Sequence, residues 1–156
     1  MTVTVTANWV AAMEKIASEI AAQGIEGVGA DVRVQRFPFD ERQIRPGCYV
    51  TPTDRKYSRP TTSHSTIGYG CMVTVIQGVS RRAASDPARL TGWQEVVSRM
   101  FHDKRLHSDD YNSETLCLPC KVEDETPLEP DVILEKYPQA EVTSLVVRVW
   151  LRETRT

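Results

Sequence analysis

The chain has 156 residues, of which 40% are hydrophobic and 26% are charged. This composition is typical of one globular domain and excludes general disorder. The 19 basic and 21 acidic residues leave a net charge of −2, so the chain as a whole lacks the basic excess of a nucleic-acid-binding protein. No apolar run approaches the roughly 20 residues that span a bilayer, and the first ten residues lack the pattern of a signal peptide. We therefore expect a cytoplasmic protein that does not enter a membrane.

The first predicted element is a helix from about Asn8 to Gln23. Its apolar residues recur at spacings of four, three and four, which places them on one helical face. Asn8 is a candidate N-cap, and Gly24 is a candidate residue to end the helix. The apolar residues of this face are Trp9, Met13, Ile16 and Ile20.

Three strands are expected next, separated by breaks in the pattern. Alternating residues predict strands from Asp31 to Phe37 and from Ile67 to Val79, and a short strand is expected from Cys48 to Thr51. The glycines of the strand that begins at Ile67 indicate a bulge or a close backbone approach. The polar stretch from Pro52 to Ser65 has no periodicity, so we expect a long loop there. A loop of this length in a small domain is usually functional or disordered.

A second helix is expected from Pro87 to about Lys104. Asp86 is a candidate cap, and proline suits the first helical position. A wide apolar stripe predicts that this helix packs on a sheet. The stripe consists of Leu90, Trp93, Val96, Val97, Met100 and Phe101.

The last third of the chain begins with an acidic, proline-rich region and ends with a strand. A short strand is expected within Thr115 to Val122, interrupted near Pro119, and another within Asp131 to Glu135. The segment from Val142 to Arg152 is apolar on both sides near its middle, which predicts a strand in the centre of the sheet.

This order of elements predicts an α+β fold, with one mixed, mainly antiparallel β-sheet packed against two α-helices and a long polar loop between strands. Residues 1–156 then form a single domain, in which loop 52–65 and the acidic segment 106–141 are insertions. That segment carries two basic and ten acidic residues, whereas residues 31–59 carry seven basic and four acidic ones. Solvated loop acids and complementary faces on neighbouring subunits both account for this asymmetry.

The sharpest local motif is Cys117-Leu-Pro-Cys120. Such a pair is a redox centre where a helix N-terminus lowers a thiol pKa, and half of a zinc site where two further ligands are close. Neither context is evident in the sequence, so we favour structural thiols. Cys117 and Cys120 remain the candidate metal ligands, and no cofactor is expected.

Common catalytic and nucleotide-binding motifs are also missing from the sequence. There is no GxSxG elbow and no phosphate-binding loop. His102 and His107 are five residues apart, which is not the helical spacing of a metal pair. We therefore expect a protein that is not an enzyme, with a metal- or thiol-dependent enzyme as an alternative.

The layout of the whole chain resembles the tail-terminator, or tail completion, proteins of long-tailed bacteriophages. An amphipathic opening helix precedes strands that flank a polar loop, and the strand after the loop carries Ile67-Gly-Tyr-Gly70. A helix with an aromatic stripe, Trp93 and Phe101, is followed by a terminal strand from Ser144 to Arg152. The resemblance lies in this layout. The Cys117/Cys120 pair and the long acidic segment do not match the family.

The resemblance implies a structural virion protein, made in the host cytoplasm, that forms a hexameric ring. This ring terminates the tail tube and joins it to the head or neck. The implied partners are other copies of the chain, tail-tube and neck or connector proteins, and DNA that passes through the channel without sequence recognition. A stopper or adaptor protein of the neck and a small protein-binding module are the alternatives. In this interpretation loop 52–65 is the subunit interface, through Asp54, Arg55, Lys56, Tyr57, Arg59 and His64.

Overall fold

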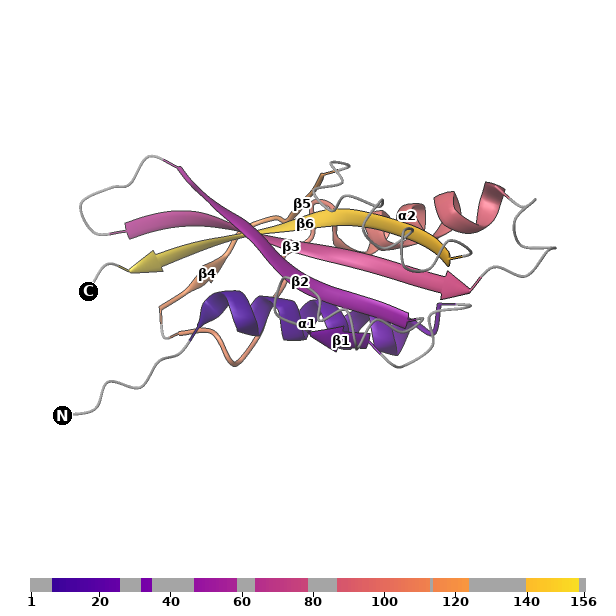
Figure 1. The fold of residues 1–156 in the computed structure, drawn as a ribbon. Coiled ribbons are helices and arrows are strands. Elements are labelled where there is room, and N and C mark those ends of the chain that lie inside the picture. The colour runs from indigo at the N-terminus through magenta and orange to yellow at the C-terminus, as the bar shows by residue number, and fades with distance from the viewer. Residues whose placement is uncertain are drawn as a thin grey trace.

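A computed structural model describes residues 7–25, 32–34, 47–58, 64–78, 87–112, 114–123 and 140–154. They form the predicted α+β fold, in which two helices pack on a mixed, mostly antiparallel and strongly curled sheet (Figure 1). In chain order the elements are α1 (Asn8–Gln23), β1 (Val32–Val34), β2 (Gly47–Tyr57), β3 (His64–Gly78), α2 (Pro87–Phe101), β4 (Leu116–Cys117), β5 (Lys121–Glu123) and β6 (Ala140–Thr154).

The centre of the sheet is the antiparallel pair of β3 and β6, which runs from His64 opposite Thr154 to Gly78 opposite Ala140. β2 pairs antiparallel with the other edge of β3, and β1 runs parallel to the first part of β2. The two short strands β4 and β5 both pair with the far edge of β6. The terminal strand is therefore central, as the sequence predicts.

One apolar cluster joins both helices to one face of the sheet. α1 contacts β1, β2 and β3, whereas α2 contacts β5 and β6. Because side chains alternate along a strand, every second residue enters this cluster along the first part of β2 and the middle of β3 and β6. Its strand members include Cys48, Val50, Ile67, Tyr69, Cys71, Val73, Val75, Leu145, Val147, Val149 and Leu151, and its helical members include Met13, Ile16, Ile20, Trp93, Val97 and Phe101.

The opposite face of the sheet is also buried along the middle of the strands. Its side chains pair across β2, β3 and β6 in register, and each is less than 9% exposed. Burial on both faces is what a central strand requires, and it explains the run of apolar residues in β6. The residues are Tyr49, Thr51, Met72, Thr74, Val146 and Arg148.

Helix α1 has the predicted bounds, but its N-cap differs from the prediction. Ala7 occupies the cap position and makes no side-chain capping bond. The predicted cap, Asn8, is instead a buried residue of the first turn, since its side chain bonds to Thr115 and Glu153. Gly24 ends the helix in the left-handed conformation, at a φ of 65°, as predicted.

The predicted long loop from Pro52 to Ser65 is wrong for most of its length. β2 continues through Tyr57, and β3 begins at His64. Polar side chains hid this extension, because the second half of β2 is an exposed edge strand, which the chain protects with charge. The pairing shifts register between Pro52 and Arg55, as in a β-bulge, which obscures the alternation.

Helix α2 begins at Pro87 as predicted but ends at Phe101 rather than near Lys104. Asp103 adopts a positive φ of 60°, and the Lys104 amide donates to the Phe101 carbonyl, which closes the last turn. The predicted cap Asp86 and the side chain of Leu90 lie outside the described residues. The stripe side chains Trp93, Val97 and Phe101 are buried in the core.

The first part of the acidic segment 106–141 belongs to the body of the fold. β4 and β5 lie on either side of Pro119, so the predicted interruption is confirmed. Leu106, Cys117 and Cys120 are members of the core cluster. Residues 124–139, with the strand predicted from Asp131 to Glu135, lie outside the described residues.

Candidate interaction surface

An arginine between two aromatic rings lies where β2 and β3 project beyond the centre of the sheet. The Arg55 guanidinium carbon is 5.7 Å from the centroid of the Trp9 ring and 5.8 Å from that of Tyr57. Both distances are within the range of cation–π attraction. Tyr69 completes the group, since its ring centroid lies 5.7 Å from that of Trp9. We call Trp9, Arg55, Tyr57 and Tyr69 the distal cluster.

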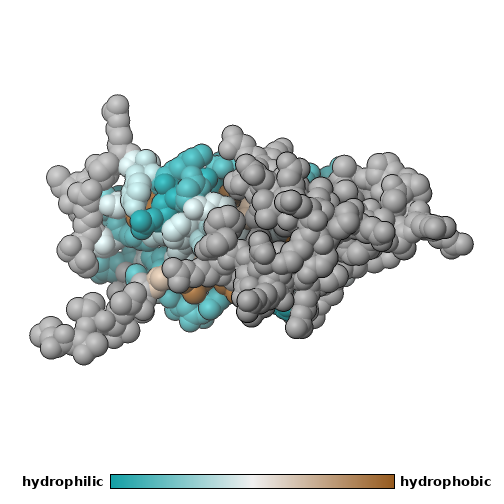
Figure 2. Space-filling model, viewed as in Figure 1, coloured by the Kyte–Doolittle hydropathy of each residue, from teal (hydrophilic) through white to brown (hydrophobic). Residues whose placement is uncertain are grey.

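The distal cluster is anchored on the inside and open on the outside. Trp9 is half-buried, and its Nε1 donates to the Gly70 carbonyl at 3.0 Å. Arg55 is exposed, and Tyr57 is 61% exposed. Figure 2 shows that the visible described surface at the end where β2 and β3 project is hydrophilic to neutral, with apolar colour confined to small areas. The distal cluster therefore presents Arg55 and Tyr57 at a polar surface, beside the anchored ring of Trp9.

A partly buried polar group fixes the inner side of the distal cluster. The Glu153 carboxylate accepts from the Tyr69 hydroxyl at 2.6 Å and from Asn8 Nδ2 at 2.7 Å. Asn8 Oδ1 in turn accepts from the Asn112 amide at 2.7 Å. Burial, and then the bonds to Glu153, raise the pKa of Tyr69 far above its usual value, so its hydroxyl stays a donor. These contacts tie α1, β3, β6 and the segment before β4 together.

The charged side chains on the other side of β2 contact Arg148 and its partner Glu123. This arginine is 3% exposed and donates to Glu123 Oε1 at 2.7 Å, to Asp54 Oδ1 at 2.9 Å and to the Gly68 carbonyl at 3.1 Å. Lys56 lies 3.5 Å from the same Glu123 oxygen. The network joins β2, β5 and β6, and we call Asp54, Glu123 and Arg148 the arginine network.

The charge of Arg148 stabilises the ionised forms of both carboxylates. Hydrogen bonding to Arg148 is the largest influence on Glu123 and on Asp54, and it lowers the pKa of each below its usual value. Both carboxylates are therefore ionised at neutral pH. Their negative charges balance the positive charge of the buried guanidinium.

The glycines of β3 make room for this arrangement. A Cβ at Gly70 would clash with the Thr53 hydroxyl and lie 2.7 Å from Asp54 Oδ1. A Cβ at Gly68 would lie 2.9 Å from side-chain atoms of Arg148 and Trp150. The sequence prediction of a bulge or a close approach at these glycines is confirmed.

The predicted interface residues fall into two groups on opposite faces of β2. Arg55 and Tyr57 belong to the distal cluster, whereas Asp54 and Lys56 lie at the arginine network. His64 is the first residue of β3 and pairs with Thr154. Arg59 lies outside the described residues. Alternation along a strand, which a loop would lack, separates the two groups.

Sequence reasoning missed the partners that other elements supply. The sequence places Trp9 in the apolar stripe of the first helix, and Arg148 lies in a strand whose middle is predicted to be apolar on both sides. The signals were an aromatic residue in the first turn of a helix and an arginine inside an otherwise apolar strand. Neither signal identifies a partner, because the contacts join residues that are far apart in the chain.

The cysteines of the CxxC motif are buried. The Cys117 thiol donates to the Leu106 carbonyl at 3.2 Å. Burial raises the pKa of Cys117 and raises that of Cys120 to about 11, so neither thiol is a ready nucleophile. Among the described residues, no group of three or more histidine, cysteine or acidic side chains could hold a metal ion.

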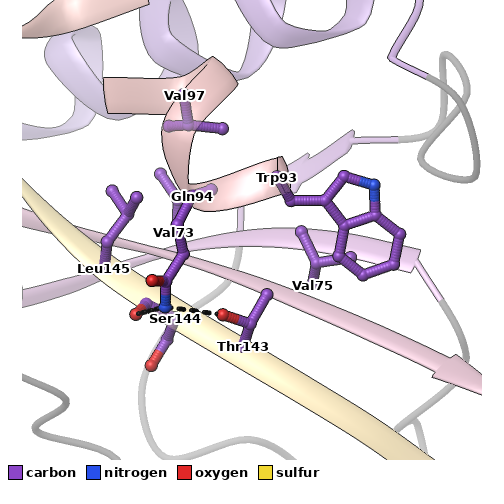
Figure 3. A pocket seen from close by; sticks show the side chains of 8 residues that line it. All are labelled: Val73, Val75, Trp93, Gln94, Val97, Thr143, Ser144 and Leu145. Carbon is purple, nitrogen blue, oxygen red and sulfur yellow. Dashed lines mark hydrogen bonds between the residues drawn. The ribbon is translucent and has the colours of Figure 1, made fainter. Parts of the chain in front are cut away.

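A small gap beneath α2 is a packing feature. Its volume of about 10 Å³ is about the least that can hold one water molecule, and its walls are mostly apolar. Gln94 spans its polar end, since its Nε2 donates to Thr143 Oγ1 at 2.8 Å and to the Ser144 carbonyl at 3.4 Å (Figure 3). Trp93, Val97 and Val75 line the rest of the gap. The gap has no room for a substrate.

The sequence matches no protein-family model, and no curated protein is significantly similar to it. Within the ranges that the structure describes, neither helix is long and apolar enough to cross a membrane. The distal cluster therefore has to be interpreted from its own geometry.

Proposed function

We propose that this chain is a structural subunit of a tailed-phage virion that forms a ring, ends the tail tube and joins it to the head or neck. The proposal rests on the resemblance in layout and on the distal cluster. The number of subunits, six, comes from the resemblance alone. The partners are other copies of the chain and the tube or neck proteins that the ring contacts.

The observation that carries the proposal is Arg55 between Trp9 and Tyr57 on an exposed edge strand. Tryptophan, tyrosine and arginine are the residues most enriched among those that dominate binding energy at protein interfaces. Their geometry here is pre-organised, because Trp9 is bonded to Gly70 and Tyr69 to Glu153. A surface that is already ordered loses less conformational entropy when it binds.

The mass of the protein in solution, measured by light scattering across a concentration series, tests the proposal. We expect a species of six copies of the 17.6 kDa chain, alone or on addition of tail tubes. Arg55→Ala with Tyr57→Ser should abolish this species, since it removes the two exposed members of the distal cluster. Arg99→Ala is the control, because Arg99 is also an exposed arginine and lies on the outside of α2.

A wild-type protein that stays a single copy at every concentration, with and without tubes, contradicts the ring. Binding of a different protein through the distal cluster would then support the protein-binding module. An unchanged mass for the Arg55 and Tyr57 variant, with an intact fold by circular dichroism, would place the ring contact on another surface.

A further inference from the structure

A cationic cleft lies between α1 and the segment that follows α2. Its volume is about 270 Å³. Lys15 is paired with Glu19 at 3.4 Å, but none of the described acidic residues pairs with Lys104 or Arg105. The cleft therefore has two cations that no described carboxylate compensates, above an apolar floor. It is lined by Lys15, Glu19, Met100, Phe101, Lys104, Arg105, Leu106 and His107.

An acidic turn follows the cleft directly along the chain. Asp109 and Asp110 are both exposed, and neither carboxylate pairs with a described cation. The turn is held in place, since the Asp110 amide donates to Ser108 Oγ at 3.2 Å and the Tyr111 hydroxyl donates to the Leu106 carbonyl at 3.0 Å. The backbone that carries the two carboxylates is therefore held beside the cleft.

The cleft and the acidic turn are displaced from one another along α1. The cleft lies at the level of Lys15, whereas the end of the turn is bonded to the start of the helix, through Asn112 and Asn8. Asn8 and Lys15 are seven residues apart in α1, which corresponds to about 10 Å along the helix axis. Positive and negative charge thus lie side by side on one surface.

We propose that two copies of the chain pair through this surface, with the cationic cleft of each copy receiving the acidic turn of the other. A two-fold interface uses the same patch on both copies, so it needs a patch that is complementary to itself. Adjacent charges of opposite sign meet this condition, because rotation by half a turn places the acidic turn opposite the cleft. The pairing goes beyond the ring and does not depend on it.

The same arrangement argues against a nucleic acid as the occupant. A phosphate chain that reached Lys104 and Arg105 would also approach Asp109 and Asp110, and like charges repel. A second copy presents a carboxylate pair to the cations and a cation pair to the carboxylates, so all four charges are matched. Charge complementarity of this kind sets the register of a contact and suppresses wrong partners.

The pairing should be weak and sensitive to salt. Exposed ion pairs contribute little individually, and they are screened as ionic strength rises. Apolar contact with the floor of the cleft, where Met100 is half-buried, contributes the part of the binding free energy that salt does not screen. We expect the dissociation constant to rise at least about tenfold between low salt and about 0.5 M NaCl.

Sedimentation at low salt tests the pairing with two single charge reversals. Arg105→Glu and Asp110→Lys should each weaken self-association about tenfold, because each reversal turns two attractions into repulsions in a two-fold pair. An equimolar mixture of the two variants should associate as well as the wild type, since each reversed charge meets its opposite. Glu95→Lys mixed with labelled Arg105→Glu is the matched control: the Glu95→Lys chains should pair with one another, and the labelled chains should associate more weakly than they do with Asp110→Lys.

Three results would overturn the proposal. They are a wild type that never exceeds a single copy at low salt, reversal variants that associate as the wild type does, and labelled Arg105→Glu chains that associate as well with Glu95→Lys as with Asp110→Lys. The test is separate from that of the ring. Replacing Arg55 and Tyr57 should break a ring and leave these pairs, whereas Arg105→Glu should do the reverse.

Discussion

Arg148 shows how much a single residue depends on its surroundings. It lies almost fully buried in the middle of β6, where its neighbours on both sides are apolar. A buried guanidinium is tolerated only when carboxylates and carbonyls satisfy it, and here Glu123, Asp54 and Gly68 do so. The arginine network therefore holds β5 and the projecting half of β2 against β6. It does so at a position where a central strand usually makes an apolar contact.

Arg148→Met should lower the free energy of unfolding at neutral pH by about 2 kcal/mol. The loss is below that of a fully buried pair, because the Asp54 side chain is 57% exposed and can regain water when Arg148 is absent. Urea denaturation measures the change. Arg152→Met, an exposed arginine of the same strand, is the control and should cost little. Equal losses for the two variants would contradict the network.

The arginine network also predicts how stability depends on pH. The folded-state pKa values of Glu123 and Asp54 lie below their unfolded values, which are near 4. The stabilisation is therefore present above the unfolded pKa values and is lost as pH falls through the folded ones. Between about pH 7 and about pH 3, the wild type should lose more free energy of unfolding than Arg148→Met. Parallel pH profiles for the two proteins would show that the network contributes nothing.

The thiols provide a second prediction at the scale of residues. All four cysteines are free and buried, and burial raises the pKa of Cys48 to about 12. In the native protein, a thiol reagent at about pH 8 should therefore react only as fast as the chain opens. All four thiols should react at once in denaturant. Rapid labelling of native Cys117 or Cys120 would favour the redox alternative.

Helix α2 allows a test of how backbone entropy at one residue affects the stability of the protein. Gly92 lies inside this helix, and a Cβ there would meet no atom within 4 Å. Gly92→Ala should therefore raise the free energy of unfolding by about 0.5–1 kcal/mol, because alanine loses less backbone entropy. Thermal unfolding measures it.

Gly24→Ala is the matched control for Gly92→Ala, and it should have the opposite sign. A Cβ at Gly24 also meets nothing within 4 Å, but the residue adopts a φ of 65°. Left-handed backbone costs alanine about 1 kcal/mol, so this variant should be destabilised. The same sign for both variants would contradict the assignment of Gly24 as the residue that ends α1.

At the scale of the whole molecule, the β3–β6 pair organises everything else. The two strands pair along 15 residues each, whereas β1 and β5 pair along three residues and β4 along two. Opening the centre requires both helices to leave the sheet, while the short outer strands can open alone.

Hydrogen exchange should therefore divide the sheet into two classes. The amides of Val146 to Leu151 should exchange only through global unfolding, and those of β1 should exchange much faster. Exchange followed by magnetic resonance, at two denaturant concentrations, distinguishes the two routes. Equal protection of β1 and β6 would mean that the sheet opens as one unit.

Some features of the protein were determined by the sequence itself. Periodicity located α1, the body of α2 and the long strands β3 and β6, because burial of one helical face or one strand face leaves a local pattern. Pro87 marked the start of α2, since proline suits the first helical position. Gly24 marked the end of α1, since few other residues adopt its conformation readily. These features depend on residues that are close together in the chain.

Other features were decided only by the tertiary structure. The extent of β2 depends on pairing with β3, which polar residues at an exposed edge do not reveal. Asn8 became a long-range bonding residue instead of a cap, because Glu153, 145 positions away, lies within 2.7 Å of it. The distal cluster, the arginine network and the cleft are likewise made of residues from several elements. Their positions follow from how the helices and strands pack, and no local pattern in the chain encodes that.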